Sequence, residues 1–401
     1  MTNQLVVLST ASRPDASRPL HILTLTPFYP TNTDDAAGCF VYEPLLSTSK
    51  LGIRNTVFAA QPFYRGGRAE SDRLSIPAQW IRYFAFPGGF GLPSAGAFLF
   101  AQTVSRLREM QREHPIDLIH AHGALPCGHA AMLLSSELGI PFVVSVHGLD
   151  AYSTVQVEGN FGEWCRRISQ RTYITSRRVI CISEHVREQV LEGVGKSCRT
   201  SVVYNGVDTD LFSPTTEPLS NSPVILSVGN LIPIKGHELL IRAVASLKLN
   251  FPSIALEIVG SGPEHRRLEE LVRTLECGDC VRFVGRRSRR ETAKAMRRCT
   301  IFALPSRYEG LGCVYLEAMS TGKPVIACRG QGIAEIIRHG SNGFLVGPGN
   351  DKELAVVISM LLRDEPSQKR LRTAARETIV DGFTLADQAE RFVRIYQECA
   401  G

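Results

Sequence analysis

Two glutamates, Glu309 and Glu317, stand eight residues apart around a glycine-containing segment. The apolar run 300–305 before them is typical of a strand, and the helical pattern after them begins near Leu311 or Gly312. A junction from strand to helix in an open parallel sheet lies along the edge where ligands bind. We therefore expect Glu309 in the loop and Glu317 on the second turn of the helix.

The first backbone amides of that helix have no partner within it, so they can bind a phosphate. We expect this role for the amides of Leu311, Gly312, Cys313 and Val314. Each flanking carboxylate can accept hydrogen bonds from a pair of hydroxyl groups. A phosphate cradle between two carboxylates predicts a sugar nucleotide as the ligand. The alternative for Glu317, a solvated helix face, fits less well because its neighbours are apolar and an unpaired carboxylate among them would be costly.

The rest of the chain must build the sheets that position these groups. Its 401 residues, 44% of them hydrophobic, are too many for one ordinary core and are typical of two domains. From Leu20 short β-branched runs alternate with longer amphipathic ones, which predicts a parallel sheet covered by helices on both faces. The alternation stops in the Ser-, Pro- and Thr-rich stretch 212–223 and restarts at Val224. The predicted fold class is α/β, with two doubly wound domains that face each other across a cleft.

The predicted boundaries follow from this pattern. They are an N-terminal extension at residues 1–18, a first domain at 19–215, a second domain at 216–384, and a final helix at 385–401 that can pack back on the first domain.

Composition indicates a compartment and excludes some partners. No apolar stretch approaches the roughly 18–20 residues that span a bilayer, and the first residues lack the pattern of a signal peptide. The 11 cysteines are scattered, several of them inside apolar strand patterns, which is typical of reduced packing residues in a cytosolic enzyme. We expect a cytoplasmic protein.

The net charge of +6 is modest, but many arginines are clustered. The clusters are Arg166, Arg167, Arg171, Arg177 and Arg178 in one stretch, and Arg286, Arg287, Arg289, Arg290, Arg297 and Arg298 in another. Solvated faces are the favoured interpretation. Contact with an anionic partner, such as a nucleotide, a phospholipid surface or a lipid pyrophosphate, is the alternative. Nothing beyond the charge indicates nucleic acid, and none is expected as a partner.

An ordered set of short motifs runs along both halves. In the first half they are Asp35-Ala36-Ala37-Gly38-Cys39-Phe40-Val41, His147-Gly148-Leu149-Asp150 and Val203-Tyr204-Asn205-Gly206-Val207-Asp208; in the second they are Gly229-Asn230-Leu231 with Lys235-Gly236, Gly260-Ser261-Gly262-Pro263, the two-glutamate segment, Gly322-Lys323-Pro324 and Gly340-Ser341-Asn342-Gly343. Each is weak alone, but their order and spacing together are specific. This set resembles the family 4 retaining glycosyltransferases (glycosyl transferases group 1) over nearly the whole chain from about Leu20. The resemblance implies the GT-B architecture of two facing Rossmann-like domains.

The resemblance also implies roles for several residues. The second domain would hold the nucleotide sugar, with Gly229 and Asn230 among the residues that bind this donor. Glu309 would contact the sugar hydroxyls and Glu317 the ribose hydroxyls. His147, at the end of an apolar strand, would lie near the anomeric centre and the primary hydroxyl of the sugar. Gly38 would let the backbone approach the diphosphate or the transferred sugar.

Lys235 follows the strand that ends at Gly229, and the loop between them can bring its ammonium onto the diphosphate, where it offsets charge on the leaving group. The family usually carries an arginine directly after that first glycine, and this chain has Asn230. Either Lys235 acts with the helix amides alone or an arginine elsewhere substitutes.

Two patterns suggest a metal and are discounted. His120 and His122 form a His-x-His pair without an evident third ligand, and Cys277 and Cys280 form a single CxxC without a second pair. The resemblance implies chemistry without a bound metal or other cofactor.

The predicted function is transfer of a hexosyl unit, with retention, from a nucleoside diphosphate sugar to a hydroxyl of a glycan, lipid-linked or small-molecule acceptor. The predicted location is the cytoplasm, with the inner face of the membrane as a candidate site of action. Two alternatives stay open: a nucleotide-sugar 2-epimerase of the same architecture, and a catalytically silent sugar-nucleotide-binding protein.

Overall fold

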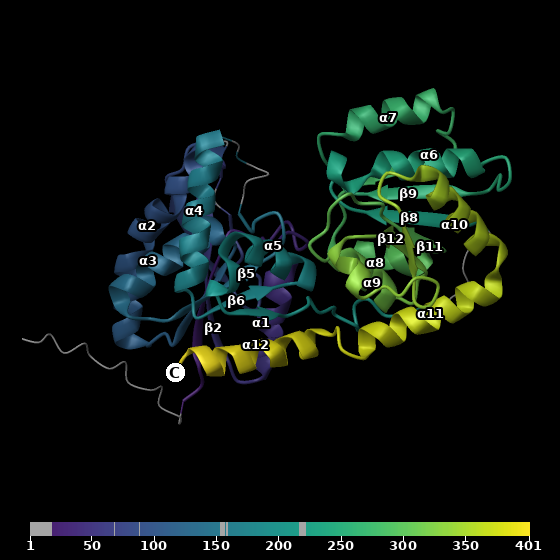
Figure 1. Ribbon diagram of the computed structural model, residues 1–401. Helices are drawn as coiled ribbons and strands as arrows, with labels where there is room; N and C mark the ends of the chain where they lie inside the picture. The colour runs from purple at the N-terminus through teal and green to yellow at the C-terminus, as the bar shows by residue number, and fades with distance from the viewer. Residues whose placement is uncertain (1–17, 68, 88, 153–156, 158, 216–221) are drawn as a thin grey trace, which may run out of the picture.

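The computed structural model describes residues 18–67, 69–87, 89–152, 157, 159–215 and 222–401. In this part of the chain the strands form two parallel sheets, one of seven strands and one of six, with helices on both faces of each (Figure 1). The predicted fold class is confirmed. Most of the expected N-terminal extension and most of the residues around the expected boundary at 215 and 216 lie outside the described residues.

The N-terminal domain is built on the seven-stranded sheet, with strand order β3-β2-β1-β4-β5-β6-β7. Its strands are β1 (His21–Thr26), β2 (Arg54–Pro62), β3 (Ala78–Tyr83), β4 (Leu118–His122), β5 (Phe142–Val146), β6 (Arg178–Cys181) and β7 (Thr200–Val202). Its α-helices are α1 (Cys39–Lys50), α2 (Leu92–Glu113), α3 (His129–Leu138), α4 (Gly159–Thr175) and α5 (Glu184–Val194).

The C-terminal domain is built on the six-stranded sheet, with strand order β10-β9-β8-β11-β12-β13. Its strands are β8 (Val224–Val228), β9 (Ala255–Val259), β10 (Val281–Gly285), β11 (Ile301–Ala303), β12 (Val325–Cys328) and β13 (Phe344–Val346). Its helices are the single turn η4 (Pro233–Lys235), α6 (His237–Leu247), α7 (His265–Thr274), α8 (Arg289–Arg298), α9 (Cys313–Ser320), the short η5 (Gly332–Glu335), α10 (Asp351–Arg363) and α11 (Glu365–Val380).

Strands β1, β4 and β5 are buried along their whole length. Helices cover both faces of such a sheet, so its strands are near-continuous apolar runs, and this explains why they were recognisable in the sequence. In both sheets the strand order reverses beside the first strand, between β1 and β4 and between β8 and β11. Crevices at the carboxyl ends of such strand pairs are where open α/β sheets bind ligands.

The last helix, α12 (Leu385–Cys399), returns to the N-terminal domain and runs along the lower side of its sheet (Figure 1). Its apolar side packs on residues of β1, β4, β5 and β6, and it contacts α1. The buried members of this cluster include Ile22, Leu118, Val143, Ile180, Phe392, Ile395 and Tyr396.

The chain therefore passes between the domains twice, and the two passages touch. Val207 on the first passage and Thr384 on the second form a parallel bridge, with hydrogen bonds from Val207 N to Phe383 O (3.0 Å) and from Leu385 N to Val207 O (3.1 Å). Thr384 begins α12 with a capping box that it shares with Asp387.

Direct contacts also join the two domains across the cleft. The Ser183 hydroxyl donates to the carbonyl oxygen of Gly310 (2.5 Å), and the Glu335 carboxylate accepts hydrogen bonds from the Glu184 amide and the Tyr204 hydroxyl, each at 2.9 Å. The conformation described is thus one in which the domains are in contact.

Two local differences from the expected elements have simple causes. Strand β3 was not predicted, because its sequence mixes polar and apolar residues and it forms a partly exposed edge of the sheet. Helix α9 begins at Cys313, one or two residues later than expected, because Gly312 adopts a left-handed conformation with φ of 85° that cannot continue a helix. Within the described residues, no helix is long and apolar enough to cross a membrane.

Candidate active site

The loop that carries Glu309 is fixed at several points. The Glu309 amide donates to Oε1 of Gln331 (2.8 Å), and the Glu309 carbonyl accepts from the amide of Gly332 (3.1 Å). The Tyr315 hydroxyl donates to the carbonyl oxygen of Leu304 (2.6 Å), which ties the first turn of α9 to the end of β11. Glu309 is therefore held at the carboxyl end of β11 as the sequence predicts.

Lys235 reaches the same place from the neighbouring strand. It ends η4, which follows β8, and the next residue, Gly236, has φ of 67° and packs directly on the carbonyl of Pro305. A side chain at Gly236 would collide with that carbonyl, so glycine is required at this position for the close approach.

Lys235 and Glu309 form an ion pair, with 2.6 Å between Nζ and Oε1. The Ser306 hydroxyl donates to the same carboxylate oxygen (2.9 Å). The two side chains are 21% and 9% exposed, so the pair is shielded yet reachable. Together they present one ammonium and one carboxylate at adjacent strand ends, groups suited to an anionic ligand that also carries hydroxyls.

A cavity of about 410 Å³ opens between the domains. Of the predicted ligand-binding residues it is lined by Gly38, Gly229, Asn230, Cys313, Val314 and Glu317. Arg286, Arg287 and Arg289 line it as well, and all three belong to the β10–α8 segment. The cavity is thus basic, and it includes the first turn of α9.

The other predicted residues do not line this cavity. Lys235 and Glu309 pair with each other beside it, Gly312 caps α9, and the Leu311 side chain is fully buried in the core. For Leu311, only a backbone role remains open.

Gly38 lies in the cavity wall, but close packing within its own domain already explains the glycine. Its φ is 72°, and a Cβ there would lie 2.5 Å from the carbonyl carbon of Phe28 and from the amide nitrogen of Tyr29. Gly38 therefore lets the loop after β1 fold back on itself as α1 begins.

Gly260 supports the opposite wall in a similar way. A Cβ at Gly260 would overlap the carbonyl oxygen of Gly229, and the Leu231 amide donates to Ser261 O (3.0 Å). The loops after β8 and β9 are thereby packed against each other, which fixes Gly229 and Asn230 in the cavity wall.

Glu317 sits on the second turn of α9 as expected, and it is 4% exposed. Its Oε1 accepts a hydrogen bond from Nη1 of Arg289, the first residue of α8. Arg289 was noticed in the sequence only as a member of a basic cluster. The structure makes it the partner of a predicted ligand-binding carboxylate.

His147 directly follows β5 and stacks on His122, the last residue of β4, with 3.0 Å between His147 Nε2 and His122 Nδ1. The rings of Phe28 and Phe40 pack edge-on against His147. Burial lowers the pKa of His147 to about 4, so its imidazole is neutral at neutral pH. A neutral imidazole donates a hydrogen bond through one ring nitrogen and accepts one through the other, and it adds no positive charge to the site.

The Nδ1 atom of His147 and the Oδ2 atom of Asp150 are buried without a hydrogen-bond partner. Asp150 Oδ1 accepts from the His147 amide (2.8 Å), and burial raises the pKa of Asp150 to about 6. His147 and Asp150 belong to a motif noted in the sequence, but their grouping with His122 was not predicted. The only sequence signal for His122 was the His-x-His pattern.

The two patterns that suggested a metal have other roles. His120 contacts the hydroxyls of Tyr396 and Ser145, each at 2.7 Å. Cys277 and Cys280 are buried free thiols in the turn before β10. In the described part of the chain, no group of three or more His, Cys, Asp or Glu side chains is arranged to hold a metal ion.

Two family models match the chain. Residues 42–211 match the model described as Glycosyltransferase Family 4, and residues 209–378 match the one described as Glycosyl transferases group 1. The two matches meet near the linker that the sequence pattern predicts.

Individual proteins give the same result. An uncharacterized glycosyltransferase of Methanocaldococcus jannaschii is 32% identical over 65% of this chain and 70% of its own length. A GDP-mannose-dependent alpha-(1-6)-phosphatidylinositol monomannoside mannosyltransferase of Mycobacterium tuberculosis is 28% identical over 84% of this chain and 89% of its own. The Anabaena protein HepE, solved in complex with UDP, superposes with a TM-score of 0.75 at 22% identity, covering 94% of this chain and 100% of that one.

The family models and the relatives identify the same class of protein. The two facing Rossmann-like domains, with the candidate site at their strand ends, have the architecture of that class. The chain belongs to the family 4, or group 1, glycosyltransferases of the GT-B fold.

Proposed function

We propose that this glycosyltransferase moves a hexosyl unit from a nucleoside diphosphate sugar to a hydroxyl acceptor and retains the configuration at the anomeric carbon. The observation that carries this proposal is the interdomain cavity, which joins the first turn of α9 to a wall with three arginines, beside the Lys235–Glu309 pair. Its volume of about 410 Å³ is within the range of small-molecule sites. The UDP bound by HepE and the GDP-mannose used by the mycobacterial relative support a donor of this class.

In this proposal the diphosphate lies at the amino end of α9, with the Lys235 ammonium offsetting the negative charge that develops as the nucleotide leaves. Glu309 accepts hydrogen bonds from the hydroxyls of the sugar, and Glu317 accepts them from the ribose. Neutral His147 lies toward the anomeric centre and the primary hydroxyl of the sugar. Asn230 brings no charge, so Arg286 and Arg287 in the cavity wall are the candidates for the missing cation.

Retention requires either a covalent intermediate or attack on the face from which the nucleotide departs. Glu317 is the only carboxylate among the described residues that line the cavity, and it is hydrogen-bonded to Arg289. The Glu309 carboxylate beside the cavity is ion-paired with Lys235, so neither carboxylate is a free nucleophile. This favours front-face attack, in which an oxygen of the departing phosphate takes the proton of the acceptor hydroxyl. The protein then contributes positioning, electrostatic stabilisation and exclusion of water. We propose that it does so without a metal or other cofactor.

The test is incubation of the purified protein with a panel of UDP-, GDP- and ADP-sugars, with and without glycan, lipid-linked and small-molecule acceptors. Release of nucleotide that rises with one acceptor, and an α-configured product from an α-configured donor, is the expected result. Chelator should leave the rate unchanged. A donor converted to its C2 epimer would instead identify an epimerase, and tight nucleotide binding without turnover a silent binding protein.

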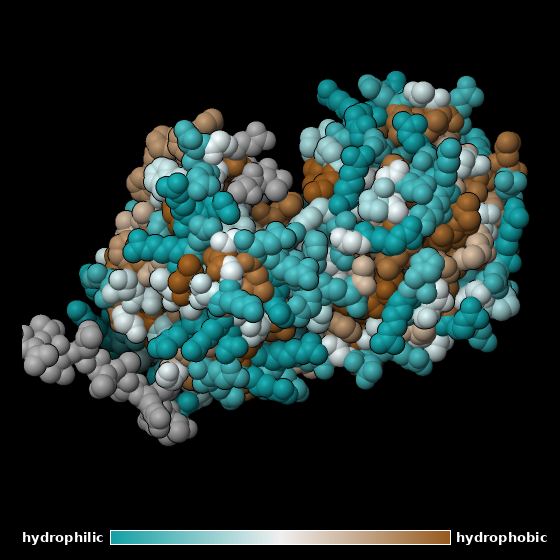
Figure 2. Space-filling model, in the orientation of Figure 1, coloured by the Kyte–Doolittle hydropathy of each residue, from teal (hydrophilic) through white to brown (hydrophobic). Residues whose placement is uncertain are grey.

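We further propose that the acceptor is presented at the inner face of the membrane. Exposed aromatic side chains lie just before α2 and in the N-terminal parts of α2 and α4, and ring contacts join several of them. Figure 2 shows hydrophobic colouring at the top of the N-terminal domain. This aromatic surface consists of Phe84, Phe86, Phe90, Phe98, Phe161 and Trp164. Arg166 and Arg167 are exposed on the same helix as Trp164, and both form ion pairs with Glu163. Exposed aromatics with nearby arginines suit an anionic lipid surface.

Co-sedimentation with vesicles tests the membrane proposal. Binding to vesicles with about 30% anionic lipid, and weak binding to neutral vesicles, is expected because the arginines need a negative surface. Trp164→Ala should reduce binding severalfold, while Val356→Ala, which shortens an exposed apolar side chain of the C-terminal domain, should not. Equal binding of both variants to both kinds of vesicle would contradict it.

A further inference from the structure

Arg289 is the only arginine buried below one tenth of its surface in the described part of the chain. It is the first residue of α8, and the capping box of Ser288 and Glu291 fixes the start of that helix. Ordering and burying an arginine is costly unless its donors are satisfied. The hydrogen-bond partners of Arg289 therefore indicate its role.

On the C-terminal side, Nη1 of Arg289 donates to Glu317 Oε1. Arg289 is the only side chain hydrogen-bonded to Glu317 among the described residues, and both residues line the interdomain cavity. The Oε2 atom of Glu317 makes no hydrogen bond within that part of the chain and is left for a ligand. The guanidinium thus fixes the direction in which the carboxylate faces.

On the other side, the same guanidinium reaches across to the N-terminal domain. Nε and Nη2 of Arg289 donate to the Glu43 carboxylate of α1 at 3.0 and 2.6 Å, and the Arg289 amide donates to Asp35 (3.1 Å). The guanidinium also lies 4.7 Å from the ring centre of Phe212, on the segment that connects the domains. This fork geometry and stacking are properties that lysine does not share.

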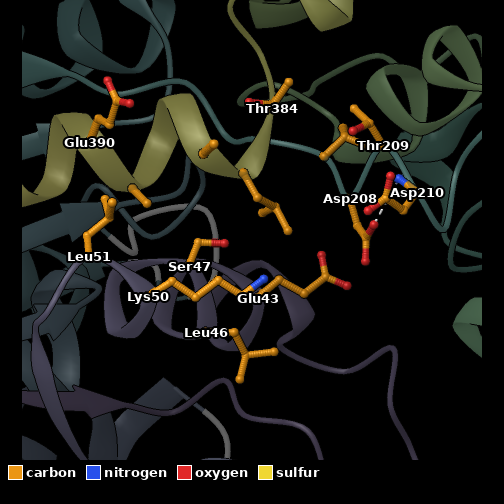
Figure 3. A pocket seen from close by; sticks show the side chains of 14 residues that line it. Glu43, Leu46, Ser47, Lys50, Leu51, Asp208, Thr209, Asp210, Thr384 and Glu390 are labelled. Atoms are coloured by element: carbon orange, nitrogen blue, oxygen red, sulfur yellow. Dashed lines mark hydrogen bonds between the residues drawn. The ribbon is translucent and has the colours of Figure 1, made fainter.

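Glu43 borders a second cavity of about 560 Å³ at the hinge, which Figure 3 shows from close by. There the Glu43 side chain extends toward Asp208, while Lys50 and Glu390 lie farther along the wall. Burial, with the nearby Glu317 and Asp208 charges, raises the pKa of Glu43 to about 7 against the opposing effect of Arg289. One guanidinium thus serves two buried carboxylates, and neither has another cation as a partner among the described residues.

We propose that Arg289 is a positioning residue that aims Glu317 at the ribose hydroxyls of the donor, and that Glu43 makes this aim depend on contact between the domains. The inference rests on the proposed function. When the domains separate, Arg289 loses Glu43 and Asp35, and the carboxylate that receives the ribose is no longer fixed. The ribose of the nucleotide is therefore fully recognised only when the two domains are in contact.

The experiment measures how each enzyme distinguishes ribose from deoxyribose. Dissociation constants for UDP and GDP are compared with those for their 2′-deoxy and 3′-deoxy counterparts by calorimetry. A hydrogen bond from a hydroxyl to a carboxylate makes the wild type favour ribose by about tenfold or more. In Glu43→Gln and Arg289→Lys this preference should fall below about threefold, although neither Glu43 nor its substitute touches the ribose.

One control comes from the hinge cavity and the other from α8. Glu390→Gln removes a carboxylate from the hinge cavity without contact to Arg289, and Arg290→Lys changes the exposed neighbour in α8. Both should keep the wild-type preference. Should Glu43→Gln lose its cooperative melting transition, Glu43→Asp, which keeps the charge and shortens the side chain, replaces it.

A purely structural role of Arg289 would weaken the ribo and deoxy ligands equally, and an unchanged ratio in both variants would overturn the inference. A wild-type ratio near one would overturn it too, because Glu317 would then not bind the ribose. Absence of any turnover by the wild type with every donor would count against the proposed function instead, so the two failures are distinguishable.

Discussion

Lys235 and Glu309 form an ion pair in this structure, so Lys235 has both a structural role and a proposed role in binding the donor. Lys235 holds Glu309 in place through the 2.6 Å ion pair and is also the cation proposed to act on the diphosphate. Removal of a group that stabilises charge in the transition state typically costs about 100-fold or more in rate. Removal of a partly shielded partner also leaves a carboxylate uncompensated.

We expect Lys235→Ala to lower the transfer rate at least about 100-fold while the protein stays folded. Lys248→Ala is the control, because Lys248 forms an ion pair of nearly the same length, 2.7 Å to Asp279, on the surface of the same domain. The rates are measured with saturating donor, and folding is followed by circular dichroism. Equal rates in the two variants would remove Lys235 from the site.

Gly38 offers a second prediction at this scale. Gly38→Ala should destabilise the N-terminal domain by several kcal/mol, because the new Cβ would meet backbone atoms at 2.5 Å. Gly52→Ala has a similar positive φ, 84° against 72°, but nothing within 4 Å, so only the conformational cost of about 1 kcal/mol applies. Urea unfolding of both variants measures the difference. If Gly52→Ala lost as much stability, close packing at Gly38 would not be the cause.

Contacts within one domain of the site could be predicted from the sequence, whereas contacts between the two domains could not. Lys235 lies in the loop after β8, and Glu309 lies in the loop after β11. Because β8 and β11 are neighbours in the sheet, their loops, and so these two residues, lie close together. The Arg289–Glu43 contact joins residues 246 positions apart on different domains. Sequence patterns describe each sheet by itself, and they carry no information on how two sheets face each other.

At the scale of elements, buried parallel strands were predictable and edge elements were not. β1 and β5 are fully buried, and their apolar runs identified them. β3 is only partly buried at the sheet edge, where Gln79 is exposed, and its mixed sequence resembles a loop. Helix α12 matches the final helix expected at 385–401. The domain on which it packs depended on the apolar face that the N-terminal sheet leaves open.

The packing of α12 leads to a prediction for this element. Phe392 is 6% exposed and belongs to the cluster that joins α12 to the N-terminal sheet. Phe392→Ala should cost about 3–5 kcal/mol, the range for removal of a buried phenyl ring, and should lower the melting temperature of the N-terminal domain. Arg394→Ala on the exposed side of the same helix, where the side chain is 73% exposed, is the control. Calorimetry with resolved domain transitions measures both, and equal losses would contradict the assignment.

At the scale of the whole molecule, buried histidines make stability depend on pH. Burial lowers the pKa of His120 to about 3, of His147 and His237 to about 4, and of His122 well below its ordinary value. In the unfolded chain these groups bind protons near pH 6.5. Between pH 6.5 and 4 unfolding therefore takes up protons, so stability falls as the pH falls.

Two buried carboxyls oppose this trend. Burial raises the pKa of Glu43 to about 7 and of Asp150 to about 6, so the folded state binds their protons more tightly and their contribution to stability falls as the pH rises. The four histidines outnumber these two carboxyls, so the effect of the histidines dominates. We expect the free energy of unfolding to fall between pH 6.5 and 4.5 by more than the ~1.4 kcal/mol per pH unit that one group can supply. Urea titrations at several pH values measure the slope, and a flat profile would contradict it.

The bridge between Val207 and Thr384 has a mechanical consequence. The two backbone segments that connect the domains run side by side and are hydrogen-bonded to each other. Such a paired connection bends more easily in one direction than it twists or slides. A single connecting segment would let one domain swivel freely over the other. We therefore expect the paired segments to restrict interdomain motion to opening and closing about one axis, so that Arg289 meets the same face of α1 each time the domains close.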